Sequence, residues 1–68
     1  MEASGTIFKV LCDWYAIGDA QHPLVETDEI HCVAYGASEA IASAKAHVSE
    51  YPLYPLSTFS VTNFRIGV

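Results

Sequence analysis

Apolar and polar residues alternate most clearly near the start of the chain, over residues 6–16. The even positions there are all apolar, whereas the odd positions mix apolar residues with Lys9 and Asp13. Side chains of a strand point alternately to its two faces, so this pattern predicts a strand whose even positions face a core. The core-facing residues would be Phe8, Val10, Cys12, Trp14 and Ala16.

Turn-forming residues follow at 18–23, where glycine, aspartate and proline come close together. Alternation returns over residues 29–35 and predicts a second strand there. The intervening residues 24–29 fit either an irregular loop or the beginning of this returning strand.

A helix is predicted over residues 39–49, which are rich in alanine, the best helix former. Ser38 is the expected N-cap, and Glu39 would lie at the positive end of the helix dipole. Two prolines within residues 51–56 end the helix. The stripe expected to face the sheet consists of Ala37, Ile41, Ala44 and Val48.

A last strand is predicted over residues 58–66. Phe59 and Val61 share one phase of the alternation, and Phe64 and Ile66 share the other. A β-bulge near residues 62–63 would turn both pairs toward the core.

The order of elements is therefore β-β-α-β, and the fold class is α+β. We expect one small domain over residues 1–68, with a three-stranded, mainly antiparallel sheet and one helix packed on one face. The first strand would lie in the centre of the sheet. A chain of 68 residues buries only about 60% of its unfolded surface and leaves little room for a substrate cleft.

The net charge of the chain limits the classes of partner that it can be expected to bind. Eight acidic residues face three basic ones, for a net charge of −5. Without a cluster of Lys and Arg, neither direct nucleic-acid binding nor binding to anionic membranes is expected. Complementary charge favours a basic protein partner, although acidity that serves solubility alone is the alternative. With no secretory signal and no long apolar run, we expect the chain in the cytoplasm.

Cysteines and histidines are the candidate metal or redox groups. A hairpin centred near His22 would place Cys12 opposite Cys32, and Asp13 opposite His31. The simplest interpretation of the two cysteines is a pair of reduced thiols in the core, with a disulfide or a metal site as alternatives. Asp13 and His31 would form a cross-strand charge pair, and His22 and His47 would lie on the surface.

Catalytic motifs are missing from the sequence. Glycine-rich phosphate loops, nucleophile elbows and paired acids in a pocket do not occur. We therefore expect a protein that is not an enzyme and that needs no cofactor or metal.

Acidic residues gather between the first two strands. Asp19, Glu26, Asp28 and Glu29 lie in a stretch without Lys or Arg. In an extended chain, Glu26 and Asp28 point to the same side about 6.6 Å apart, close to the spacing of two phosphates along a DNA strand. Such carboxylates can occupy a basic groove built for DNA, or they can form a solvated loop.

The outer face of the sheet gives a second candidate surface. Leu11, Tyr15, Val33 and Tyr35 would form a partly apolar stripe there, which Tyr51 and Tyr54 could extend. This stripe fits a protein-protein interaction module such as an antitoxin, an adaptor or an assembly factor. A homodimer or a covered edge would explain it equally well, so both a monomer and a weak homodimer remain open.

The run from Ile30 to Lys45 looks like the strand-to-helix joint of many very small phage-encoded proteins. Together with the first and last strands, it resembles the small anti-CRISPR proteins of phages, which include inhibitors of type I systems. The resemblance implies a DNA mimic that acts in a bacterial host cell and blocks the DNA-binding surface of a type I surveillance complex. The residues that would imitate phosphates are Asp13, Asp19, Glu26, Asp28, Glu29, Glu39 and Glu50.

Overall fold

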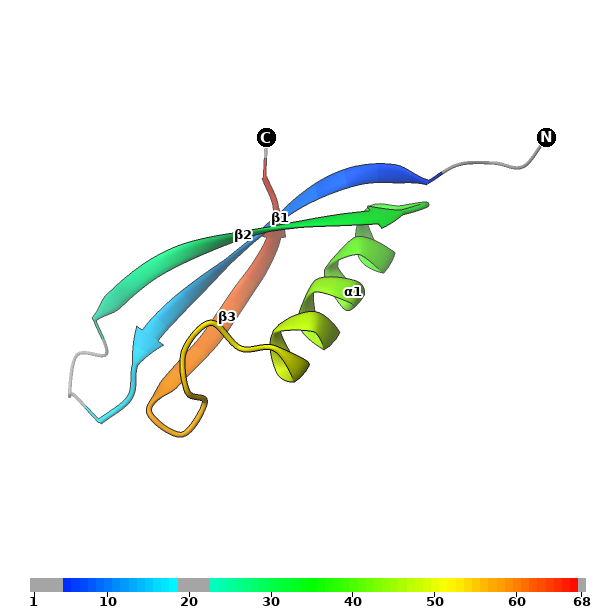
Figure 1. Ribbon diagram of the computed structural model, residues 1–68. Helices are drawn as coiled ribbons and strands as arrows, with labels where there is room; N and C mark the ends of the chain where they lie inside the picture. Colours follow the sequence, from blue (N-terminus) through cyan, green and yellow to red (C-terminus); the bar gives the residue numbers. More distant parts are fainter. Residues whose placement is uncertain (1–4, 19–22, 68) are drawn as a thin grey trace.

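A computed structural model of the protein describes residues 5–18 and 23–67, which form a three-stranded sheet and one helix. In chain order, the elements are β1 (Thr6–Ala16), β2 (Leu24–Ala34), α1 (Ala37–Glu50) and β3 (Phe59–Ile66). The strand order is β2-β1-β3, and β1 is antiparallel to both neighbours. Figure 1 shows α1 lying across one face of this sheet. The predicted α+β fold with a central first strand is confirmed.

Residues of β1 alternate between the two faces of the sheet as the sequence predicts. Val10, Cys12 and Trp14 are fully buried on the side of α1, and Phe8 packs against the same core. β2 covers Leu24–Ala34 in full, so residues 24–29 are the beginning of the returning strand and not an irregular loop.

The helix begins earlier than predicted, at Ala37. Gly36, in extended backbone, occupies the N-cap position that Ser38 was expected to fill, and no side chain caps the helix there. The carboxylate of Glu39 instead accepts a hydrogen bond of 2.6 Å from the backbone N–H of Tyr35. Glu39 thus satisfies a backbone donor just before the helix, much as the glutamate of a capping box does.

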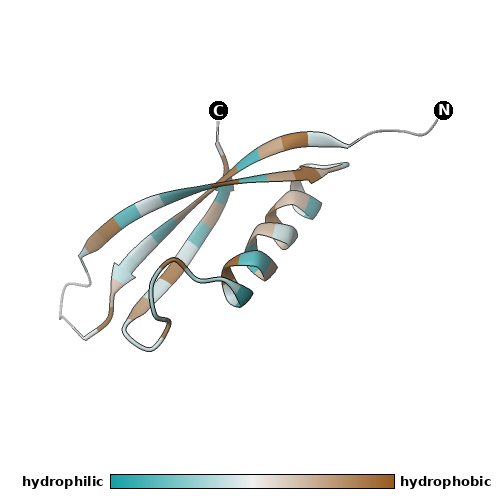
Figure 2. Cartoon of the chain, viewed as in Figure 1, coloured by the Kyte–Doolittle hydropathy of each residue, from teal (hydrophilic) through white to brown (hydrophobic). Residues whose placement is uncertain are grey.

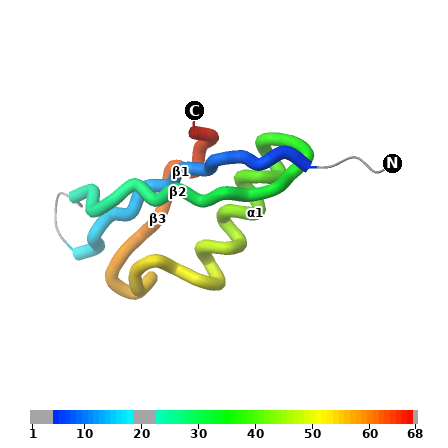
Figure 3. The backbone as a smooth tube through the Cα atoms, turned by 45° about the horizontal axis from the view of Figure 1, so that its top comes forward, coloured from blue at the N-terminus to red at the C-terminus, as the bar shows by residue number. Residues whose placement is uncertain are grey.

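Small side chains bring α1 close to the sheet. Ala40, Ala44 and Val48 are buried, and Ile41 packs beside them. Ala37, which was predicted to belong to this stripe, is exposed. The polar residues of the helix are exposed, and Figure 2 shows hydrophilic and hydrophobic residues alternating along it. Figure 3 shows the helix as a single layer against the sheet.

A β-bulge in β3 reconciles its two hydrophobic pairs, as predicted. The pairing with β1 shifts register between Leu11 and Asp13, and Asn63 adopts a positive φ of 60°. Asparagine tolerates this left-handed backbone better than most residues do. Both pairs pack into the core as a result. These residues are Phe59, Val61, Phe64 and Ile66.

An aromatic cluster fills the core beyond the end of α1. Tyr54 lies in the segment after the helix. Its ring meets the buried Trp14 ring edge-on, with 5.5 Å between the ring centres, and its ring centre lies 4.8 Å from that of Phe59.

Within the described residues, α1 falls short of the length and apolar character that a membrane-spanning helix requires.

Candidate functional site

Asp13 is held inside the structure and does not face solvent. It is 6% exposed, and its carboxylate accepts hydrogen bonds from Thr27 and Asn63 at 2.9 Å and from Arg65 at 3.1 Å. Hydrogen bonds from Asn63 and Thr27, with the Arg65 guanidinium beside them, hold the pKa of Asp13 below its ordinary value of 3.8. With its oxygens taken by three donors, Asp13 joins β1 to β2 and β3 and is a poor candidate for a phosphate mimic.

The register of the hairpin corrects the predicted cysteine pairing. Cys12 lies opposite Asp28, and Cys32 lies opposite Phe8. Both cysteines are free thiols; Cys12 is buried and Cys32 is partly buried. Burial, with the nearby negative charges of Asp28 and Asp13, raises the pKa of Cys12 to about 11. Cys12 therefore stays protonated and unreactive near neutral pH.

The predicted pair of Asp13 and His31 is also wrong. Asp13 lies opposite Thr27, and His31 lies opposite Lys9. The His31 ring pairs with Glu29 at 2.7 Å on the exposed outer face. This hydrogen bond is the main reason that the pKa of Glu29 is lowered. His47 is exposed on α1, as expected, and His22 lies outside the described residues.

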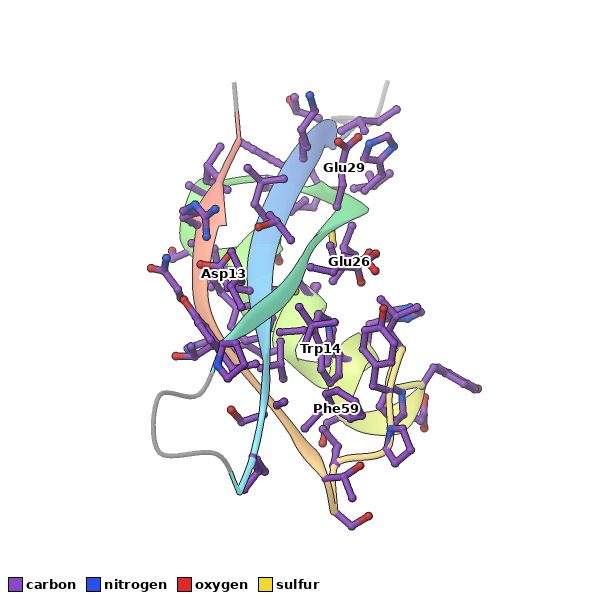
Figure 4. All side chains as sticks on the ribbon, turned by 90° about the vertical axis from the view of Figure 1, so that its left-hand side faces the viewer. Asp13, Trp14, Glu26, Glu29 and Phe59 are labelled. Carbon is purple, nitrogen blue, oxygen red and sulfur yellow. The ribbon has the colours of Figure 1, made fainter. Side chains whose placement is uncertain are left out.

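Three acidic side chains follow the edge strand β2. Glu26 and Asp28 point to the side of the sheet that carries α1, and Glu29 points to the outer face. Figure 4 shows Glu26 and Glu29 along β2, away from Asp13 beside β3. Glu26 accepts a hydrogen bond of 2.6 Å from the Tyr54 hydroxyl, and Asp28 accepts one of 2.9 Å from the Glu29 backbone N–H.

The other acids predicted to bind the partner lie at separate places in the fold. Glu39 is exposed near the start of α1 and is bonded to Tyr35, the residue that follows β2. Glu50, at the end of α1, is exposed and lines a shallow hollow on that helix together with Ser43 and His47. Asp19 lies outside the described residues.

Two of the three basic side chains are engaged near β3, whereas Lys9 of β1 lies opposite His31 of β2 on the outer face, where its charge helps to lower the pKa of Glu29. Arg65 is bound to Asp13, and the Lys45 ammonium lies 5.8 Å from the ring centre of Phe64 on β3. Apart from Asp13, every acid within residues 5–18 and 23–67 lies on β2 or α1. Glu26 and Asp28, on the α1 side of the β2 edge, therefore carry a negative field that could attract a basic partner.

The stripe expected on the outer face is interrupted, and Tyr54 does not extend it, because its ring packs against the core beside Trp14. Tyr15 lies opposite Leu24 at one end of the hairpin, whereas Val33 lies opposite Ile7 at the other. At that second end, Ile7, Val33 and Tyr35 are 69%, 68% and 72% exposed. We call these three residues the outer apolar patch.

Sequence reasoning missed two structural roles near the candidate site. Nothing in the local pattern connects Tyr54 with Glu26, which lies 28 residues earlier. Likewise, Asn63 and Arg65 reach Asp13 across about 50 residues of sequence. The bulge predicted near residues 62–63 was the feature of the sequence that could have indicated the contacts with Asp13, because bulges redirect side chains.

In the part of the chain that the structure describes, no three histidine, cysteine or acidic side chains come together to hold a metal ion. No protein-family model, no curated protein and no solved structure matches the chain. Function therefore has to be inferred from the residues themselves.

Proposed function

We propose that this chain is an inhibitor that binds a basic, nucleic-acid-binding surface of another protein and blocks it. The expected partner is a type I CRISPR surveillance complex in a bacterial host cell, as in the anti-CRISPR proteins that the chain resembles. The proposal involves binding alone, without catalysis or a cofactor.

The supporting observation is the line of carboxylates on the edge strand. Glu26, Asp28 and Glu29 are on β2, while Arg65 and Lys45 are engaged near β3 and Lys9 lies on the outer face, away from Glu26 and Asp28. A basic groove built for DNA would be attracted to this one side of the domain. Glu39 and Glu50 would extend the negative surface along α1.

A DNA-binding competition experiment tests this proposal. Purified type I surveillance complexes are mixed with labelled target DNA and increasing amounts of the protein, and bound DNA is measured by gel mobility shift. We expect DNA binding to fall as the protein is added. Because exposed charges are screened within about 10 Å at 0.1 M salt, direct binding of the protein to the complex should weaken as salt rises.

Charge-reversal variants then locate the surface. The double variant Glu26→Lys with Asp28→Lys should weaken inhibition by about tenfold or more. A control adds positive charge to exposed positions of β3 through Ser60→Lys and Thr62→Lys; its net change of +2 equals that of the neutralising β2 variant Glu26→Gln with Asp28→Asn, which is tested beside it. If the β2 variants inhibit as strongly as the wild type, the proposed DNA mimicry is wrong.

The outer apolar patch supports a second candidate function, a protein-protein interaction module of the antitoxin, adaptor or assembly-factor kind. Ile7 and Val33 lie opposite each other and Tyr35 is nearby, and all three are exposed. Apolar residues scattered singly on a surface are normal, whereas neighbouring ones often mark an interaction site. Binding that survives high salt and is lost in Val33→Thr, but not in the Glu26 and Asp28 double variant, would favour this function.

A further inference from the structure

β2 is an edge strand with a long, unused side. It runs for 11 residues, and β1 is its strand neighbour in the order β2-β1-β3. Among the described residues, no other strand lies along its outer side. An edge of this kind can pair with an extended segment of another protein.

The hydrogen bonds show which backbone groups of β2 face this edge. The N–H of Glu29 donates to the Asp28 carboxylate and so points away from β1. Opposed residues in an antiparallel pair alternate between exchanging two hydrogen bonds and exchanging none. By this alternation, Thr27, His31 and Val33 present their backbone groups to the same free edge as Glu29 does.

A groove runs beside the free edge, between β2 and α1. It has a volume of about 500 Å³, and residues 28–33 of β2 line one wall. Ser43 and His47 of α1 line the other. A strand added to β2 would place alternate side chains over this groove, against Ile30 and Cys32.

The charge of the groove selects the incoming segment. Asp28 and Glu29 line it, Glu26 lies next along the strand, and no Lys or Arg is among the lining residues. A carbonyl of an incoming strand can accept the N–H of Glu29 in place of Asp28. The released Asp28 carboxylate is then available to a Lys or Arg side chain.

We propose that an extended, Lys- or Arg-bearing segment of a protein partner adds to β2 as a fourth strand, with alternate side chains over the groove. This inference rests on the proposed function, because it specifies how the basic partner is held. It adds a requirement that charge attraction alone lacks, namely backbone pairing along β2.

Two synthetic peptides of equal charge separate pairing from charge. The first alternates lysine with valine and readily forms a strand; the second has the same sequence with every backbone nitrogen methylated, so it keeps the side chains and the charge but has no N–H to donate. We expect the first peptide to bind about tenfold more tightly in a fluorescence titration. Amide exchange should also slow at Thr27, His31 and Val33 when it binds. Equal affinity of the peptides, or unchanged exchange at those amides, would overturn strand addition.

A matched pair of variants tests the same point on the protein. His31→Pro removes an N–H that faces the free edge but none that pairs with β1, so the sheet should survive. His31→Ala removes the same imidazole and keeps the N–H. We expect the proline variant to bind the lysine-valine peptide about tenfold more weakly than the alanine variant, with similar circular dichroism spectra.

Equal peptide binding by the two variants refutes backbone pairing. The proposed function is tested separately, because it predicts salt-sensitive inhibition of the surveillance complex that depends on Glu26 and Asp28. That result can stand when strand addition fails, and strand addition can stand when no surveillance complex is inhibited.

Discussion

The hydroxyl of Tyr54 donates a hydrogen bond of 2.6 Å to the carboxylate of Glu26, and this contact joins the segment after α1 to the edge strand β2. The hydrogen bond raises the pKa of Tyr54, with burial and the charges of Glu26 and Asp28 adding to the effect. The same ring packs against Trp14 and Phe59, so one residue contacts both the core and the candidate binding surface.

Replacing Tyr54 by phenylalanine separates these two contacts. Tyr54→Phe keeps the ring packing and removes the hydrogen bond, so the melting temperature should fall by about 5 °C. Inhibition should be kept or improved, because Glu26 is released toward solvent. Tyr51→Phe is the control, since Tyr51 is exposed and its ring lies beside His47. Equal losses in the two variants by thermal denaturation would contradict the role of the hydrogen bond.

Asp13 should make the fold sensitive to acid. Its pKa is lowered in the folded chain, so its contribution is complete well above the ordinary value of 3.8 and is lost as pH falls through the lower folded value. Melting temperature should therefore decline below about pH 4. Asp13→Asn should lower the melting temperature at pH 7 by about 10 °C and flatten this acid dependence.

A control for the acid experiment is Glu50→Gln, which changes an exposed carboxylate at the end of α1. This variant should keep the acid dependence of the wild type. A similar flattening in both variants would show that Asp13 is not its source.

The two cysteines should differ in reactivity toward a thiol reagent. Cys12 is fully buried with a pKa of about 11, whereas Cys32 is partly exposed. At pH 8, mass spectrometry should find Cys32 alkylated by iodoacetamide about 100-fold faster than Cys12. Both thiols should react at similar rates in guanidinium. Equal rates in the folded protein would contradict the described core.

The close packing of α1 should exclude large side chains at its inner alanines. Ala44 is fully buried against the sheet, whereas Ala42 of the same helix is exposed. Ala44→Leu should lower the free energy of unfolding by about 1–3 kcal/mol. Ala42→Leu should change it by less than about 0.5 kcal/mol. Urea denaturation followed by circular dichroism measures both free energies of unfolding. Similar losses in the two variants would contradict the described orientation of the helix.

Alternation of residues predicted the faces of the strands well but not their register. Cys12 pairs with Asp28 instead of Cys32, a displacement of four residues along β2. An even displacement leaves every side chain on the same face, so the hydrophobic pattern cannot detect it. The assumed turn centre near His22 decided the predicted register, and that assumption was wrong.

The candidate site was predictable in part. The acids of β2 could be found because charge and extended structure are both local properties of the sequence. Asp13 could not be assigned correctly, because its environment depends on Asn63 and Arg65, which reach it through the bulge of β3. Ser38 was a reasonable cap by residue type, but the helix begins after Gly36, so Ser38 falls within its first turn.

The Asp13 network should also impose an order on folding during synthesis. β1 and β2 leave the ribosome before β3, so the nascent chain can offer Asp13 only the hydroxyl of Thr27. Until Asn63 and Arg65 arrive, burying that carboxylate is costly and the second edge of β1 has no neighbour. We therefore expect stable folding to wait for the last strand, which would leave the unfinished chain as the form most open to proteases.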